Sequence, residues 1–294
     1  MIVIFIHIAL MSVSTVTGGV LVEEGQKRGD TGRLTSLRSL MESLASLCAG
    51  PIGGWLAGVI FIVPAVICGS LAAAMAYVFG IAAMEDKVSV EHRSSAAATI
   101  VRSFRELLAN RDVWLAASLF SFYHIAPGFQ TPLFFHQTNA LHFSPVFIGY
   151  LTLLGALGAI VGSIAYGWIC RRVSFCRLFP AAILLGAGIT LSYVYYLSNK
   201  SAMLIECGNG VIGTFAFVAL LDFVARSIPK THEALGYSLV FSLGNLAASV
   251  SDIIGSRWFD HGVGFADLVC VKACSIAVIA LAFPFFPRRI EIAP

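Results

Sequence analysis

Long runs of apolar residues recur along almost the whole chain of 294 residues. A transmembrane helix needs about 20 mostly apolar residues to cross the hydrocarbon core of a bilayer. Runs of that length lie near residues 2–22, 37–57, 60–83, 113–137, 145–170, 178–198, 202–224, 235–257 and 265–286. Charged residues make up only 12% of the chain, against about 25% in a soluble domain. The sequence therefore predicts an all-α polytopic membrane protein with about nine transmembrane helices, because a helix satisfies its own backbone hydrogen bonds in lipid.

Nearly all of the 19 Lys and Arg residues fall in alternate loops, which fixes the predicted orientation. These loops lie around residues 23–36, 85–112, 171–177, 226–230 and 288–289. Loops rich in Lys and Arg stay in the cytoplasm. We therefore expect a cytoplasmic C-terminus and, with nine spans, an N-terminus outside. The expected location of the protein is the cell membrane. The first run has no basic segment before it, so it is predicted to be a true span and not a signal peptide.

The longest polar stretch divides the predicted spans into two groups. In residues 85–112, apolar side chains such as Val101, Phe104 and Leu108 recur at helical spacing between arginines. That pattern predicts an amphipathic helix on the cytoplasmic membrane surface. The expected organisation is a partial N-terminal bundle of three spans over residues 1–84, this linker at 85–112, and a six-helix bundle over 113–294.

Several classes of function are disfavoured by the composition. The net charge is only +3, and no basic stripe of the kind that binds nucleic acid is present. The 7 Cys residues sit mostly in apolar runs without metal-ligand spacing. We therefore expect no nucleic-acid partner, no metal and no cofactor. A Gly-rich nucleotide-binding loop is also missing, which argues against an ATP-driven pump.

Four local stretches resemble those of a known transporter family. They are residues 23–36, which contain Glu23-Glu24-Gly25 and Thr31-Gly32-Arg33; residues 131–149, which begin with Thr131-Pro132; residues 162–172, which contain Tyr166-Gly167 and end in Arg171-Arg172; and residues 220–245, which contain Asp222, Arg226 and Pro229. The third stretch resembles the signature between the second and third helices of one half of a major facilitator, without its usual Asp. The other three resemble the folate–biopterin transporter family within that superfamily.

This resemblance implies a partial major-facilitator fold. The six spans after residue 112 would correspond to family helices seven to twelve, and the three before it to helices four to six. The first three helices would then be missing, including one that lines the substrate cavity between the two halves. Two alternatives stay open: the chain is a truncated copy, or its reading frame begins upstream.

Polar residues near the middle of predicted spans are the candidate solute or proton sites, because a polar group in lipid is costly unless it is paired or hydrated and is therefore rare outside functional sites. His124 lies near the midpoint of 113–137, and Gln130 lies two turns further on. Asn245 and Ser242 share a polar stripe with Ser249 in 235–257. Each has a structural alternative, a hydrogen bond inside the helix bundle.

Charged residues inside the spans are the candidate gate and ion-pair residues. Asp252 and Lys272 lie at similar depths in consecutive helices, so we expect them to form an ion pair. Asp222 and Arg226 are four residues apart at the cytoplasmic edge, where their pair is expected to help close that side. Glu42 and Glu206 are further candidates to which the sequence assigns no partner.

The sequence thus favours a secondary active transporter, not an enzyme. The expected partners are the lipid bilayer, a small polar organic solute of the folate or pterin type, and a coupled proton. A drug/proton antiporter is one alternative, since residues 50–54 partly resemble the antiporter motif of those proteins. Another is a truncated membrane protein that transports nothing or serves as a partner subunit.

Overall fold

The computed structural model describes residues 18, 21–22, 24–25, 28–56, 69–70, 102–229 and 233–283. Every regular element within these ranges is helical, as predicted. Most of the predicted spans at 2–22 and 60–83, and most of the linker at 85–112, lie outside the described residues. Residues 102–109 of the linker are helical and lead to Asn110. The Asn110 side chain accepts hydrogen bonds from the first turn of α5 and so caps that helix.

The helices follow the apolar runs closely. In order they are α2 (Thr31–Leu56), α5 (Arg111–Ile125), α6 (Gln130–Phe135), α7 (Pro145–Ile169), α8 (Phe175–Leu191), α9 (Asn199–Gly208), α10 (Thr214–Ser227), α11 (Glu233–Asp260) and α12 (Phe265–Ala282). Three short helical segments continue α6, α8 and α9: the π-helix η2 (His136–Ala140), the 3-10 helix η3 (Ser192–Tyr195) and the π-helix η4 (Asn209–Gly213). Four helical segments within the described ranges are long and apolar enough to cross a membrane: Pro145–Ile169, Phe175–Tyr195, Asn199–Ser227 and Leu235–Asp260.

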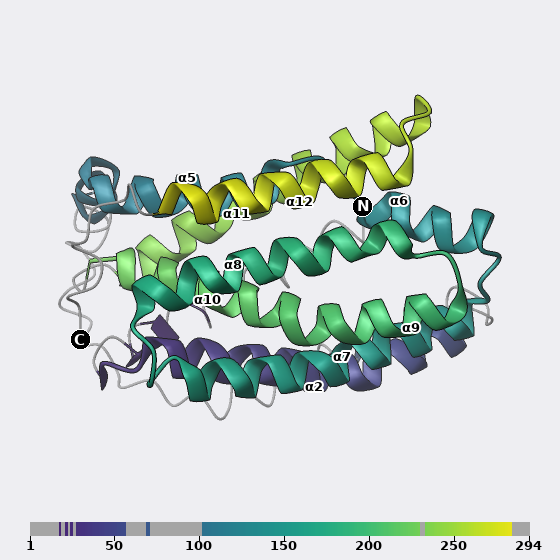
Figure 1. Cartoon of the computed structure of the whole chain (residues 1–294). Helices are drawn as coiled ribbons and strands as arrows, with labels where there is room; N and C mark the ends of the chain where they lie inside the picture. Colours follow the sequence, from purple (N-terminus) through teal and green to yellow (C-terminus); the bar gives the residue numbers. More distant parts are fainter. Residues whose placement is uncertain are drawn as a thin grey trace.

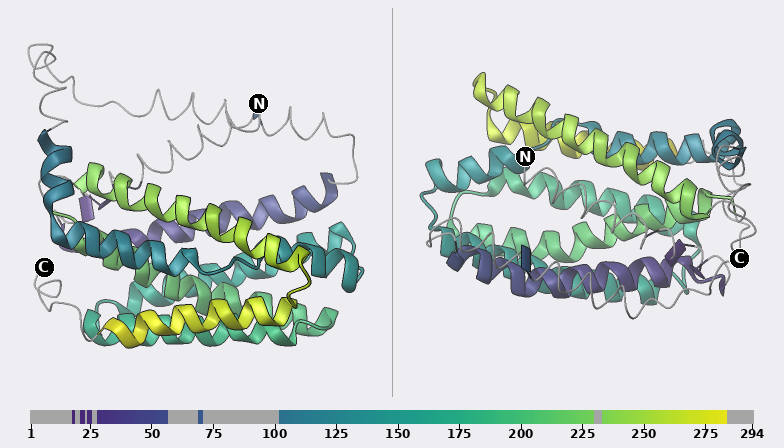
Figure 2. Two further views of the ribbon diagram at one scale, coloured as in Figure 1. Left: turned by 90° about the horizontal axis from the view of Figure 1, so that it is seen from above. Right: turned by 180° about the vertical axis from the view of Figure 1, so that it is seen from behind.

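Long helices packed along one another build the bundle. Helix α2 packs along α7, α11 along α5, and α12 along α8, while α10 contacts α2, α7 and α8. Figure 1 shows α5, α11 and α12 on one side, α2 and α7 on the other, and α8 and α10 between them. The two views in Figure 2 show the same alignment of the helices along one direction. Large apolar side chains on the outside, such as Ile164 and Trp168 on α7, are more than half exposed, as expected for surfaces that face lipid.

The buried apolar side chains form two clusters at opposite ends of the bundle. The first contains Phe120, Tyr166, Phe179 and Phe223, and the second contains Phe129, Tyr193 and Leu268. On several helices the residues between the two clusters line a cavity instead. On α7, Leu151 belongs to the second cluster, residues 152–159 supply cavity-lining side chains, and Tyr166 belongs to the first cluster. The fold therefore holds a polar cavity between two apolar layers.

Candidate functional site

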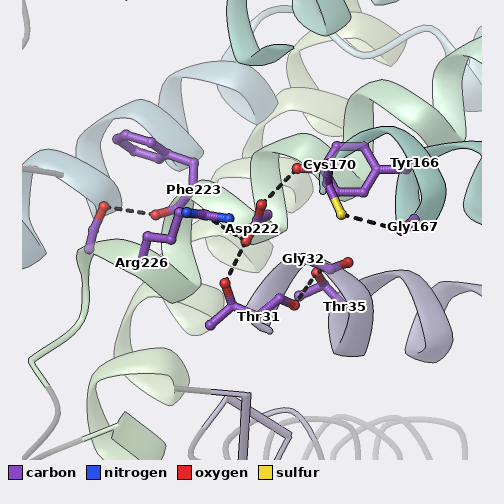
Figure 3. A network of polar contacts seen from close by, with 10 residues as sticks. Thr31, Gly32, Thr35, Tyr166, Gly167, Cys170, Asp222, Phe223 and Arg226 are labelled. Carbon is purple, nitrogen blue, oxygen red and sulfur yellow. Dashed lines mark hydrogen bonds and ion pairs between the residues drawn. The ribbon is translucent and has the colours of Figure 1, made fainter. Parts of the chain in front are cut away.

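A buried carboxylate joins three helices at the end of the bundle where α10 ends. The Asp222 side chain on α10 is fully buried. It accepts hydrogen bonds from Thr31 Oγ1 of α2 and from the Tyr166 hydroxyl of α7, both at 2.8 Å. Its third donor is Arg226 Nε, one turn along α10, at 3.0 Å. Figure 3 shows this Asp222 network, in which one side chain holds α2, α7 and α10 together.

The sequence predicted the pair of Asp222 and Arg226 but not the partners from the other helices. Gly32 lies against the carboxylate, where an added Cβ would be 2.9 Å from Asp222 Oδ2. The Arg226 guanidinium lies over the Phe175 ring at 4.8 Å from its centroid. Thr31, Tyr166 and Asp222 come from three of the stretches that carry the family resemblance. The structure brings these stretches together at one point.

Further polar contacts tie α2 to the six-helix bundle on the same side. Arg171 pairs with Asp30 just before α2 at 3.0 Å. Ser36 donates to the backbone carbonyl of Ser163 on α7 at 2.6 Å. Arg38 of α2 donates to the Tyr237 hydroxyl of α11 at 2.7 Å. This end of the molecule is therefore closed by side chains from both predicted bundles.

Arg38 is also the ion-pair partner of Glu42, to which the sequence assigned none. It pairs with Glu42 one turn along α2 at 3.0 Å. The Glu42 side chain is half exposed and belongs to the lining of the cavity described next.

The cavity between the two apolar clusters has a volume of about 780 Å³, which lies within the range of about 300–1,000 Å³ for small-molecule sites. All the long helices from α2 to α12 contribute to its wall. Its polar lining residues include Ser39, Glu42, Ser43, Tyr123, His124, Gln130, Thr190, Glu206, Asn209, Ser251, Asp252 and Lys272. The arrangement can surround a small polar molecule with hydrogen-bonding groups of both charge signs. No group of three or more His, Cys, Asp or Glu residues in the described part of the chain is placed to hold a metal ion.

Two of the four predicted solute or proton residues lie on the cavity wall. His124 lines the cavity and packs edge-on against Phe120 and Tyr123, with ring centroids 4.9 and 5.3 Å away. Gln130 lines it at the start of α6. Asn245 and Ser242 do not belong to its lining, because α11 turns Ala248, Ser251 and Asp252 toward the cavity instead.

The expected ion pair of Asp252 and Lys272 does not form in the part of the chain that the structure describes. Both side chains line the cavity, but each has other partners. Asp252 accepts from the Thr131 backbone N–H at 3.4 Å and from Thr131 Oγ1 at 2.7 Å. Lys272 Nζ donates to backbone carbonyls at the end of α5. The reason is the interruption between α5 and α6, which offers each charge free backbone groups.

Glu206 finds the partners that its sequence context did not predict. It accepts hydrogen bonds from the hydroxyl groups of Tyr193 and Tyr196 at 3.2 and 3.1 Å. Tyr196 in turn accepts from Gln137 Nε2 at 2.7 Å. The signal available in the sequence was a pair of tyrosines three residues apart at the end of one apolar run, followed by a carboxylate early in the next.

Long apolar helices, a polar cavity between them and a closed end define an integral membrane protein with a solute-sized central site. The chain belongs to the Major Facilitator Superfamily, whose sequence pattern matches residues 1–251. This confirms the predicted superfamily, and no solved structure matches the chain.

Three relatives with similar sequences are named as transporters of small organic molecules. The chain is 23% identical over 172 residues to the folate-biopterin transporter of Synechocystis sp., a match covering 55% of this chain and 35% of the relative. It is 25% identical over 144 residues to folate transporter 1 of Plasmodium falciparum, with 44% and 28% covered. It is 28% identical over 134 residues to a gallate transporter of Pseudomonas putida, with 45% and 30% covered. The aligned residues thus span about a third of each relative. All three names describe transporters and not enzymes, and the two folate names agree with the predicted folate–biopterin transporter-like character.

Proposed function

We propose that the chain is a secondary active transporter that moves a small polar organic solute of the folate or pterin type by alternating access. The observation that carries this proposal is the cavity of about 780 Å³, which lies between two apolar clusters and whose polar wall is shared by α2 and helices α5 to α12. The family membership and the names of the relatives support it.

The architecture proposed for this activity is the one expected from the sequence. About nine spans cross the cell membrane, with three in residues 1–84, the linker at 85–112 on the cytoplasmic surface, and six in 113–294. The C-terminus is cytoplasmic, because nearly all Lys and Arg residues lie in the loops on that side. The end of the bundle that holds Asp222 then faces the cytoplasm.

The Asp222 network is proposed to be the cytoplasmic gate. Its hydrogen bonds link α2 of the first bundle to α7 and α10 of the second, so separating the bundles on this side must break them. The pairs of Arg171 with Asp30 and of Arg38 with Tyr237 would open in the same movement. The described conformation would then be the one closed to the cytoplasm.

Solute binding is proposed to involve Gln130 and His124, which lie on the cavity wall. His124 is also a candidate proton carrier, because an imidazole can both accept and release a proton and this one lines the cavity. Asn245 and Ser242 remain candidates only for a conformation in which α11 has turned, since neither lines the cavity described here.

Uptake by the full chain in proteoliposomes tests this proposal. An inward proton gradient should drive accumulation of labelled folate or pterin, and unlabelled pterin should compete. Gln130→Leu should raise KM, and a rise in KM for Ser242→Ala would indicate that α11 turns Ser242 toward the solute in another conformation. Competition by a lipophilic cation but not by pterin would indicate a drug/proton antiporter. Absence of uptake for all of these solutes would indicate a non-transporting protein or a partner subunit.

A further inference from the structure

The interruption between α5 and α6 leaves backbone carbonyls without their helical partners. The carbonyl of Tyr123 would bond to the N–H four residues later, but that residue is Pro127, which has none. The carbonyl of His124 would bond to Gly128, whose N–H instead donates to the carbonyl of Ser251 on α11 at 2.8 Å. The sequence Pro127-Gly128 thus creates a small group of free oxygens at the C-terminal end of α5.

Lys272 of α12 fills that group of oxygens. Its Nζ donates to the carbonyl oxygens of Tyr123, His124 and Ala126 at 3.1, 3.0 and 3.3 Å. A positive charge is favoured at a helix C-terminus, where the helix dipole is negative. An ammonium group has three N–H donors, and here three carbonyls accept from it.

The opposite end of the interruption receives the opposite charge. Asp252 accepts from the backbone N–H and the hydroxyl of Thr131 in the first turn of α6. The two charges therefore neutralise the facing ends of the two helices, and this explains why they do not pair with each other.

Packing against α11 holds the oxygen group in place. Ser251 Oγ also donates to the carbonyl of Ala126. A Cβ on Gly128 would lie 3.0 Å from the Cα of Asp252, so the backbones of the interruption and of α11 are in close contact. The carbonyls are therefore positioned by neighbouring backbone and not by Lys272 alone.

We propose that the carbonyls of Tyr123, His124 and Ala126 form a monovalent-cation site that the ammonium group of Lys272 occupies as a built-in cation. Carbonyls of interrupted membrane helices bind inorganic cations in other transporters. Oxygens spaced for an ammonium group suit K⁺ better than the smaller Na⁺. The chain with Lys272 in place then needs no inorganic cation at this site.

Thermal unfolding of the full chain in lipid nanodiscs tests the proposal without measuring uptake, so its failure is separate from failure of the proposed function. The midpoint is followed in KCl, NaCl, NH₄Cl and choline chloride at equal ionic strength. Lys272→Ala leaves room for an ion, whereas Lys272→Met removes the charge but fills most of the space. Lys200→Ala at the exposed start of α9 is the control for loss of a lysine.

In choline chloride both Lys272 variants should unfold at a lower temperature than the parent chain. K⁺ should restore the midpoint of Lys272→Ala in a saturable manner and Na⁺ should do so less well. The parent chain, Lys272→Met and Lys200→Ala should show no such cation dependence. Rescue by NH₄⁺ alone would overturn the proposal, because the oxygens would then recognise N–H donors only. Failure of Lys272→Ala to fold in K⁺, or K⁺-specific stabilisation of the parent chain, would also overturn it.

Discussion

At the scale of single residues, Asp222 is a buried charged side chain that connects three helices through hydrogen bonds. It is fully buried, and its donors come from α2, α7 and its own helix. A buried charge is tolerated only when it is paired and hydrogen-bonded. The arrangement is therefore sensitive both to loss of the carboxylate and to loss of its shape.

Replacing Asp222 should separate these two contributions. Asp222→Ala leaves Arg226, Tyr166 and Thr31 without their acceptor, and breaking a buried ion pair from one side costs about 3–5 kcal/mol. Asp222→Asn keeps the shape and one acceptor oxygen, so its loss of stability should be smaller. Denaturant unfolding of both variants in detergent measures the difference. Equal losses for Ala and Asn would mean that the hydrogen bonds to Asp222 contribute nothing beyond its charge.

Gly32 tests how closely α2 must approach this carboxylate. An added Cβ would lie 2.9 Å from Asp222 Oδ2 and 3.2 Å from Cys170 Sγ, so Gly32→Ala should push α2 away from α7 and α10. Overpacking of this kind costs about 1–3 kcal/mol. We expect a lower unfolding temperature and slower uptake. Gly188→Ala is the control because nothing lies within 4 Å of its added Cβ, and an equal loss there would contradict the explanation.

At the scale of helices, small residues allow α7 to lie directly against the backbone of the end of α9 and of η4. Gly158 and Gly162, which form a GxxxG pair in the sequence, contact the backbone of Cys207 and Val211. Small residues at this spacing let membrane helices approach closely. The pair was recognisable from the sequence, but the helix that it contacts was not.

Gly162→Ala should therefore separate α7 from η4. An added Cβ would clash with the carbonyl of Val211, and backbone cannot move aside as a flexible side chain does. The same substitution at Gly155, on the same helix, meets atoms no closer than 3.8 Å. We expect Gly162→Ala to lower the unfolding midpoint clearly and Gly155→Ala to leave it nearly unchanged. If both variants behave alike, the close approach at Gly162 has no energetic weight.

The sequence predicted the helices better than the side-chain partners. Apolar runs locate α7 to α12 because lipid imposes one length on every span. The length of the apolar run predicted one span over 113–137, whereas the structure has two helices, α5 and α6, with an interruption between them. Pro127-Gly128 is a turn signal at this interruption. His124, Asp252 and Lys272 were identified as polar groups inside spans, but their partners depend on how each helix is rotated about its axis. That rotation is set by neighbours distant in sequence, so the sequence did not reveal that Ser242 lies off the wall of this cavity or that two tyrosines surround Glu206.

At the scale of the whole molecule, the two apolar clusters and the cavity between them separate the two ends of the bundle. The Asp222 network lies at one end, beside the larger cluster. Glu206 and its tyrosines lie at the other, beside the smaller cluster. Under the proposed alternating access, one end would open while the other stays closed, with α2 moving against helices α5 to α12.

Cys170 reports on such an opening, because it lies just after α7 and beside the Asp222 network (Figure 3). Its thiol is partly buried and donates a hydrogen bond to the Gly167 carbonyl at 3.5 Å. The thiolate is the form that reacts with maleimides, so at pH 7.5 alkylation of this partly buried, hydrogen-bonded thiol should be slow. Opening the gate would admit water and reagent to the thiol. A folate or pterin that is transported should therefore accelerate alkylation of Cys170.

The measurement needs a background in which the other cysteines are replaced by Ser, with Cys170 as the reporter. Ser174→Cys, in the same background without Cys170, is the matched control, since Ser174 is exposed and its side chain makes no capping hydrogen bond. Its labelling should be fast and independent of solute. Gly32→Ala should accelerate labelling of Cys170 even without solute, because it weakens the same closure. Fast labelling of Cys170 that neither solute nor Gly32→Ala changes would show that this end stays open to solvent. The Asp222 network would then not be the cytoplasmic gate of an alternating-access cycle.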